Sequence, residues 1–111
     1  MHVILIGGNI SNNAYRSYGN FASETIDYIH IDVAILGTKG FTTYENEYEL
    51  KRHILQQSEK IIVVTDKNKF NAQPEYTYCK FKEVDVFISN PLTKEEKHQI
   101  QVIPEIIEAE V

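Results

Sequence analysis

The sequence predicts an α/β domain built in three layers around a mainly parallel sheet of about five strands. Short apolar, β-branched segments alternate along the chain with longer segments in which apolar residues recur at helical spacing. Strands separated by helices imply crossover connections, and such connections join parallel strands. The 111 residues correspond to one domain, because single domains usually hold roughly 100–200 residues. No repeat, linker or low-complexity segment divides them.

The first half of the chain contains two expected strands and a helix between them. Residues 2–6 are β-branched and are followed by two glycines, which predicts the first strand. A helix is expected at about residues 20–29, where apolar residues fall on one face. The second strand is expected at residues 32–36. Its residues are apolar without alternation, which is typical of a strand covered on both faces.

A second helix is expected from about residue 45 to residue 58. Thr42 and Glu45 have the spacing of a capping box at its start. Glu47 and Lys51 are four residues apart, in the order that favours an ion pair on a helix surface.

The next segments are strands joined by a long connection. Residues 60–65 form the clearest strand of the sequence, and residues 84–89 form the fourth strand. Between them, residues 66–82 contain Pro74 and polar runs, and they indicate a connection without a helix or strand.

The chain ends with an expected helix and strand. Thr93 and Glu96 form a capping box that opens a third helix, which should end near Pro104. Residues 105–111 are expected to be the last strand. Because three helices are too few to cover both faces of such a sheet, an apolar surface should remain for a partner.

Composition excludes several classes of function. Eleven basic and 16 acidic residues give a formal charge of −5, and a chain with this balance is unsuited to binding a nucleic-acid backbone unaided. The longest wholly apolar run, Val3–Ile6, is too short to span a membrane, and no secretory signal is recognisable. The single cysteine, Cys79, has no partner for an internal disulfide, which favours a cytoplasmic protein.

Glycine, polar and cationic residues follow the expected strands. In open parallel sheets, ligands bind beyond the carboxyl ends of the strands. Glycines there expose backbone N–H groups, and lysines supply positive charge to an anionic group such as a phosphate. The four segments concerned are Gly7–Asn9, Gly37–Gly40, Asp66–Phe70 and Ser89–Pro91. Each could be an ordinary turn, so the prediction of a binding site depends on their joint placement at one edge.

Other kinds of site are not indicated. The run after the first expected strand lacks the G-x-G-x-x-G spacing of a dinucleotide site, and the chain contains no Walker loop. The histidines are scattered and have no metal-ligand spacing with Cys79. No serine lies in a nucleophile elbow. We therefore expect no catalytic residues, no metal and no cofactor.

Six segments occur in an order that resembles the DeoR family of bacterial repressors. They are Val3–Ile10, Tyr18–Ala22, Asp32–Thr43, Glu47–Arg52, Asp66–Phe70 and Asp85–Asn90. They resemble the C-terminal effector domain of that family, which senses phosphorylated sugars and is related in fold to ribose-phosphate isomerases. By this resemblance, residues 1–111 form a single, partial effector-binding domain of a cytoplasmic, homo-oligomeric regulator of sugar metabolism. Repressors of the lactose phosphotransferase type are one such group.

The resemblance also implies an effector site, made of Gly37, Thr38, Lys39, Gly40, Glu47, Asp66 and Lys69. In the family, the glycine-bounded turn lines the sugar pocket. The helix that matches Glu47 and Lys51 lies beneath this pocket, and the lysine that matches Lys69 points toward the ligand.

Three positions depart from the family pattern, and two family elements are missing. Lys39 replaces an acidic or amide residue, Asn68 replaces serine, and Asn90 replaces aspartate. Lys39 changes which sugar is expected, but the ligand should still be anionic. The winged helix-turn-helix and the Ser-Gly-Thr-Thr phosphate loop do not occur in these residues. DNA is therefore expected as a partner only through an N-terminal domain, and the pocket should be incomplete.

Two other functions remain open. A sugar-phosphate isomerase needs a carboxylate base, for which Glu47 and Asp66 are candidates, with Lys69 stabilising the enediolate. Alternatively, the uncovered apolar surface could make the chain an assembly module without a ligand.

Overall fold

The fold is organised around a four-stranded parallel sheet. The computed structural model describes residues 1–7, 9–10, 17–18, 20–37, 45–66 and 80–110. The sheet has the order β3-β4-β5-β6, and each neighbouring pair is parallel. Its strands are β3 (Ile31–Gly37), β4 (Ser58–Val64), β5 (Val86–Ser89) and β6 (Glu105–Glu108). The α/β class and the parallel sheet are confirmed, although the described residues give the sheet four strands rather than about five.

The prediction of a first strand at residues 2–6 is wrong. Residues 1–7 belong to no strand, and the side chains of Val3, Ile4 and Leu5 are exposed. The chain instead forms a short antiparallel hairpin from β1 (Asn9–Ile10) and β2 (Ser17–Tyr18). β-Branched composition favours extended backbone, but a strand also needs a hydrogen-bonded neighbour. No other strand among the described residues pairs with residues 2–6.

The first two helices lie close to their expected positions. Helix α1 (Asn20–Ile26) ends at Ile26 rather than at residue 29, and Ala22 and Ile26 of its apolar face are buried. Helix α2 (Glu45–Gln57) matches its expected range almost completely and buries Leu55. The predicted capping box of Thr42 with Glu45 lies outside the described residues.

The third helix, α3 (Lys94–Gln99), begins as predicted but ends well before Pro104. The Thr93 hydroxyl accepts the backbone N–H of Glu96 at 3.2 Å, and the Glu96 carboxylate accepts the backbone N–H of Thr93 at 2.9 Å. This reciprocal capping satisfies two N–H groups that have no partner within the helix. No helix within the described ranges has the length and apolar character that crossing a lipid bilayer requires.

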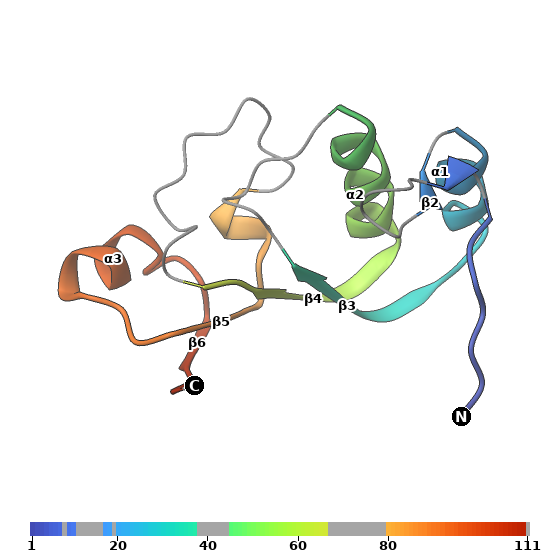
Figure 1. Ribbon diagram of the computed structural model, residues 1–111. Coiled ribbons are helices and arrows are strands. Elements are labelled where there is room, and N and C mark those ends of the chain that lie inside the picture. The colour runs from blue at the N-terminus through green and yellow to red at the C-terminus, as the bar shows by residue number, and fades with distance from the viewer. Residues whose placement is uncertain (8, 11–16, 19, 38–44, 67–79, 111) are drawn as a thin grey trace.

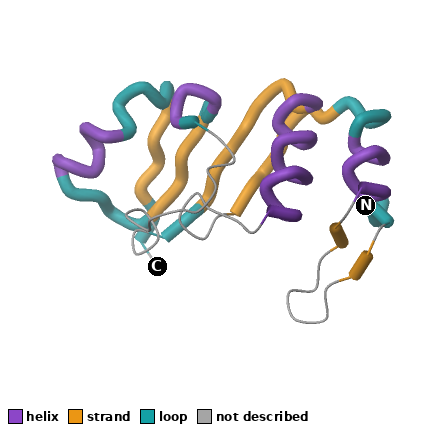
Figure 2. Tube along the Cα trace, turned by 90° about the horizontal axis from the view of Figure 1, so that it is seen from above, coloured by secondary structure: helices purple, strands orange, loops and turns teal. Residues whose placement is uncertain are grey.

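A hydrophobic cluster of described residues joins α2 and the segments beside α3 to one face of the sheet. Figure 1 shows the helices on this side of the sheet. Phe87 of β5 and Val63 of β4 are completely buried at its centre. The cluster also includes residues from α2 and from the segments on both sides of α3. Its members are Leu36, Leu55, Ile61, Val63, Val84, Phe87, Leu92, Ile100 and Ile103. Figure 2, which looks down on this side, shows α2 next to β3 and β4, with α1 and α3 toward opposite ends of the sheet.

The opposite face of the sheet is uncovered by the described residues. In β3, Ala34 and Leu36 are buried, whereas Val33 and Ile35 are exposed, the latter by 70%. Val64 and Ile107 are further exposed apolar residues, in β4 and β6. The prediction that β3 is covered on both faces is therefore wrong, and the prediction of a remaining apolar surface is confirmed. We call this side the open face.

The cap of α3 gives a test of the local structure. Thr93→Ala removes the hydroxyl that accepts the backbone N–H of Glu96. The free energy of unfolding of this variant should therefore be lower by about 1 kcal/mol. Urea denaturation measures this difference. Thr93→Ser keeps the hydroxyl and should lose much less, so equal losses for the two variants would contradict the capping role.

Candidate functional site

The strand register aligns the carboxyl ends of the sheet. Gly37 pairs with Val64, Val64 with Ile88, and Ile88 with Ile107. Residues that directly follow this row must therefore emerge at one edge of the sheet, where open parallel sheets bind ligands. We call this edge the carboxyl rim. Its described residues are Gly37, Thr65, Asp66, Ser89 and Asn90.

A lysine from α2 reaches the carboxyl rim. The Lys51 ammonium Nζ donates a hydrogen bond to the Gly37 carbonyl oxygen over 2.9 Å. The rim thus holds a fixed positive charge beside the last residue of β3. A Cβ atom added at Gly37 would meet no atom within 4 Å. It would point to the side of the sheet on which Val33 and Ile35 are exposed, away from the helix that carries Lys51.

The turns after β4 and β5 are tied to their neighbours in the sheet. The backbone N–H of Thr65 donates to the Ile88 carbonyl at 3.0 Å, and that of Ala109 donates to the Ser89 carbonyl at 2.7 Å. The Ser89 hydroxyl is almost fully buried and donates to the Asn90 carbonyl at 2.8 Å. These bonds extend the sheet beyond its last paired residues, and they place half-buried Asp66 and Asn90 at neighbouring positions along the rim.

Two residues of the predicted effector site lie at the rim, namely Gly37 and Asp66. Glu47 lies in α2, but its side chain is outside the described part of the structure, as are Thr38, Lys39, Gly40 and Lys69. The expectation that residues 7–9 form a corner after a strand of the same sheet is wrong. Gly7 follows no strand, and Asn9 belongs to the separate β1–β2 hairpin.

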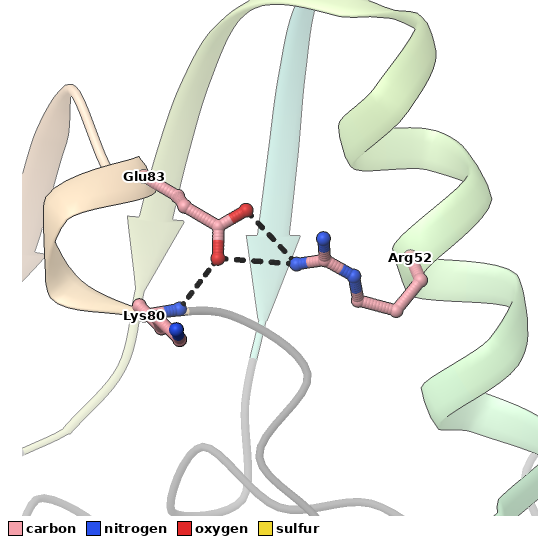
Figure 3. Close-up of polar contacts among 3 residues, drawn as sticks. All are labelled: Arg52, Lys80 and Glu83. Atoms are coloured by element: carbon pink, nitrogen blue, oxygen red, sulfur yellow. Dashed lines mark hydrogen bonds and ion pairs between the residues drawn. The ribbon is translucent and has the colours of Figure 1, made fainter.

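Arg52, the residue next to Lys51 in α2, forms an ion pair with Glu83 (Figure 3). Its guanidinium Nη1 lies 3.1 Å from Oε1 and 2.9 Å from Oε2 of Glu83. Glu83 belongs to a short 3₁₀ helix, η2 (Phe81–Glu83), and its Oε1 also accepts the backbone N–H of Lys80 at 2.9 Å. The ion pair therefore ties α2 to the segment that leads into β5.

The environment of Glu83 favours its charged form. Burial by itself raises the pKa of this carboxyl, but the hydrogen bonds from Lys80 and Arg52 and the positive charge of Arg52 outweigh it. The pKa of Glu83 consequently lies below its ordinary value.

Three side chains with metal-ligand chemistry gather at the other end of the sheet, where β3 and β4 begin. The candidate ligand atoms of His30, Asp32 and Glu59 all lie within 4.8 Å of one another. His30 Nε2 is 3.3 Å from Asp32 Oδ1 and 3.6 Å from Glu59 Oε2. All three residues are exposed. The His30 imidazole contacts both the Asp32 and the Glu59 carboxylate. It thereby separates two negative charges on adjacent strands, which would otherwise repel each other.

Sequence reasoning did not identify the contacts of Lys51 and Arg52. The expected surface pair of Lys51 with Glu47 stays a prediction, because the Glu47 side chain lies outside the described residues. The sequence predicts no role for Arg52. The spacing within α2 shows only which residues share a helix face. The partners Gly37 and Glu83 are 14 and 31 residues away in the chain, so no local pattern indicates them.

Comparison with known proteins gives one consistent result. The family model described as the DeoR C-terminal sensor domain matches residues 1–91. Over 98 residues, 83% of this chain, the sequence is 26% identical to the HTH-type transcriptional repressor GlcR of Bacillus subtilis (strain 168). It is 28% identical to a putative aga operon transcriptional repressor of Escherichia coli O157:H7, and 27% identical to the HTH-type transcriptional regulator GolR of Listeria innocua, each over 79% of this chain.

These relatives are much longer than the chain described here. The matched regions cover 38% of GlcR, 35% of the aga repressor and 37% of GolR. The chain therefore spans little more than a third of the length of the curated relatives that it matches.

The ion pair at Glu83 predicts a pH-dependent stability. The pKa of Glu83 is lower in the folded chain than in the unfolded chain, where it is about 4.3. Its carboxylate therefore stabilises the fold fully at pH values above the unfolded pKa. This stabilisation is lost as the pH falls through the folded pKa. Glu83→Gln should therefore lower the free energy of unfolding by about 1–2 kcal/mol at pH 7 and by much less in acid. Urea denaturation across this pH range measures the effect.

The control for this prediction is Glu105→Gln, at an exposed position of β6. It should leave both the stability at pH 7 and its pH dependence nearly unchanged. A Glu83→Gln chain whose loss of stability is the same at pH 7 and in acid would contradict the assignment.

Proposed function

We propose that this chain, which belongs to the DeoR C-terminal sensor domain family, senses a phosphorylated sugar at its carboxyl rim for a DeoR-type transcriptional repressor. The observation that carries the proposal is the meeting of Gly37, Lys51 and Asp66 at one edge of the sheet. An ammonium group at the rim attracts an anion, and a carboxylate at the same rim accepts hydrogen bonds from sugar hydroxyls. A phosphorylated sugar carries both kinds of group.

The remaining predicted site residues supplement this arrangement. Thr38, Lys39 and Gly40 follow Gly37 in the chain, and Lys69 follows Asp66. We propose that the two lysines share with Lys51 the neutralisation of the phosphate, and that Glu47 helps to orient Lys51 from the same helix. Three cationic groups in a chain of net charge −5 would make the rim a local exception to the overall charge.

In a complete regulator, the effector would act on DNA binding through a different part of the protein. GlcR is an HTH-type repressor and GolR an HTH-type regulator, and both extend well beyond the matched region. An effector shifts a conformational balance only by binding one state more tightly than the other. The proposed role of residues 1–111 is to supply this differential affinity in the cytoplasm, while a helix-turn-helix domain contacts the operator.

We propose no catalytic role for the chain. The named relatives are transcriptional regulators. Isomerisation would need a base beside the sugar carbonyl together with a group that stabilises the enediolate. Of the candidates, Asp66 lies at the rim, whereas the side chains of Glu47 and Lys69 lie outside the described residues.

Calorimetric titration with a panel of hexose and pentose phosphates tests the proposal. At least one compound should bind saturably, and the unphosphorylated sugar should bind far more weakly. Lys51→Met removes the charge at the rim and should weaken binding by about 10-fold or more, since a charge-assisted hydrogen bond is worth about 1.5–3 kcal/mol.

The matched control is Lys60→Met, because Lys60 is an exposed residue near the beginning of β4, away from the rim. It should keep the affinity of the unaltered chain. Absence of saturable binding by every phosphosugar would contradict the proposal, and so would equal losses for Lys51→Met and Lys60→Met.

A further inference from the structure

Three consecutive basic residues of α2 contact three different parts of the fold. Lys51 Nζ donates to the last carbonyl of β3, and Arg52 pairs with Glu83 in η2. His53 Nδ1 lies 2.6 Å from Oδ1 of Asp27, which directly follows α1. Successive residues of an α-helix point about 100° apart. The three contacts therefore lie on different sides of α2, and together they oppose its rotation.

The contact of Lys51 is too weak to hold the helix. Its hydrogen bond is exposed, so water competes for the ammonium group, and the net contribution of such a bond to stability is small. The lysine also reaches its acceptor through a flexible four-carbon chain. Other contacts must therefore hold α2 if the ammonium group is to stay at the carboxyl rim.

Arg52 makes the stronger contact (Figure 3). Its Nη1 lies within 3.1 Å of both carboxylate oxygens of Glu83, and the two side chains are only 31% and 28% exposed. Hydrogen bonds between charged groups are roughly twice as strong as neutral ones. Arg52 also precedes buried Leu55 by three residues, so the two are neighbours on the helix surface. The ion pair thus acts at the margin of the buried face of α2, where it opposes rotation of the helix.

The carboxylate that pairs with α2 belongs to a segment anchored to the sheet. Val84, the residue after Glu83, is almost fully buried. The backbone N–H of Asp85 donates to the carbonyl of Ile61 in β4 at 2.9 Å, and the Asp85 carboxylate accepts the backbone N–H of Ile61 at 2.8 Å. Because β4 pairs with β3, the path of contacts from the carboxyl rim through α2 and η2 begins and ends on the sheet.

We propose that Arg52 is a positioning residue for the effector site, and that its ion pair with Glu83 sets the place from which Lys51 reaches the carboxyl rim. This role rests on the proposed function, and it adds a pair of residues that control effector affinity without touching the effector. An arginine beside an anion site is ordinarily a direct phosphate ligand. Here the guanidinium is already engaged, and its departure would leave a half-buried carboxylate without its counter-charge.

The ¹³C signal of the Gly37 carbonyl tests the proposal without an effector, because a hydrogen bond to the oxygen shifts this signal. Lys51→Met gives the position of the signal without the bond. Arg52→Gln and Glu83→Gln should each move the signal in the same direction, since α2 then no longer holds the ammonium group beside the oxygen. The matched control is Ile103→Val, which removes a buried methyl group before β6 and lowers stability away from the rim. It should leave the signal in place.

Calorimetric titration with glucose 6-phosphate and ribose 5-phosphate, one hexose and one pentose phosphate, measures the effect on binding. Arg52→Gln and Glu83→Gln should each weaken the binding of whichever compound the unaltered chain binds by about 5-fold or more. The double variant should lose little more than either single variant, because both changes remove the same ion pair. Ile103→Val should keep the affinity of the unaltered chain, and an equal loss in this control would overturn the positioning role.

Glu83→Gln separates positioning from direct binding of the phosphate. If Arg52 bound the phosphate itself, removal of the Glu83 charge would free its guanidinium, and the affinity would rise or stay the same. Either result would overturn the proposal, and so would a Gly37 signal that neither Arg52→Gln nor Glu83→Gln moves. If the unaltered chain bound neither sugar phosphate, the proposed function would fail, whereas the Gly37 signal would still decide whether Arg52 positions Lys51.

Discussion

The parallel register of the sheet is the constraint on which the rest of the structure depends. Pairing of Gly37 with Val64, and of Val64 with Ile88, fixes where each strand ends relative to its neighbour. The backbone N–H of Ile61 reinforces this register by donating to the Asp85 carboxylate at 2.8 Å. A slip of one residue would turn every buried side chain to the other face. The same slip would separate the residues that meet at the carboxyl rim.

The hydrophobic core lies on only one side of this sheet. Phe87 and Val63 are fully buried beneath the helices, whereas Ile35 on the other side is mostly exposed. Parallel sheets are ordinarily covered on both faces. The one-sided core therefore separates two regions of the molecule. The covered side and the carboxyl rim hold the candidate effector site, and the open side presents exposed apolar residues.

Local signals in the sequence predicted the elements that local interactions determine. Thr93 and Glu96 cap their helix through contacts three residues apart, and α2 follows directly from its own residues. The strand at residues 2–6 was predicted wrongly, because pairing depends on a neighbour that propensity does not supply. Of the candidate site, only the position of two residues at the carboxyl rim can be compared with the prediction. The ends of the expected strands predicted that Gly37 and Asp66 lie at one edge of the sheet. The contact of Lys51 with Gly37 was not predicted, because it arises only when α2 packs beside β3.

The most direct test of the central claim is to map the bound effector by nuclear magnetic resonance. Titration of the ¹⁵N-labelled chain with the tightest-binding sugar phosphate should shift the amide signals of Gly37, Thr65, Asp66 and Asn90, which share the carboxyl rim. Signals of Ile31 and Asp32, where β3 begins, should stay in place. Shifts confined to the beginning of the strands, or scattered over both ends of the sheet, would contradict a binding site at the carboxyl rim.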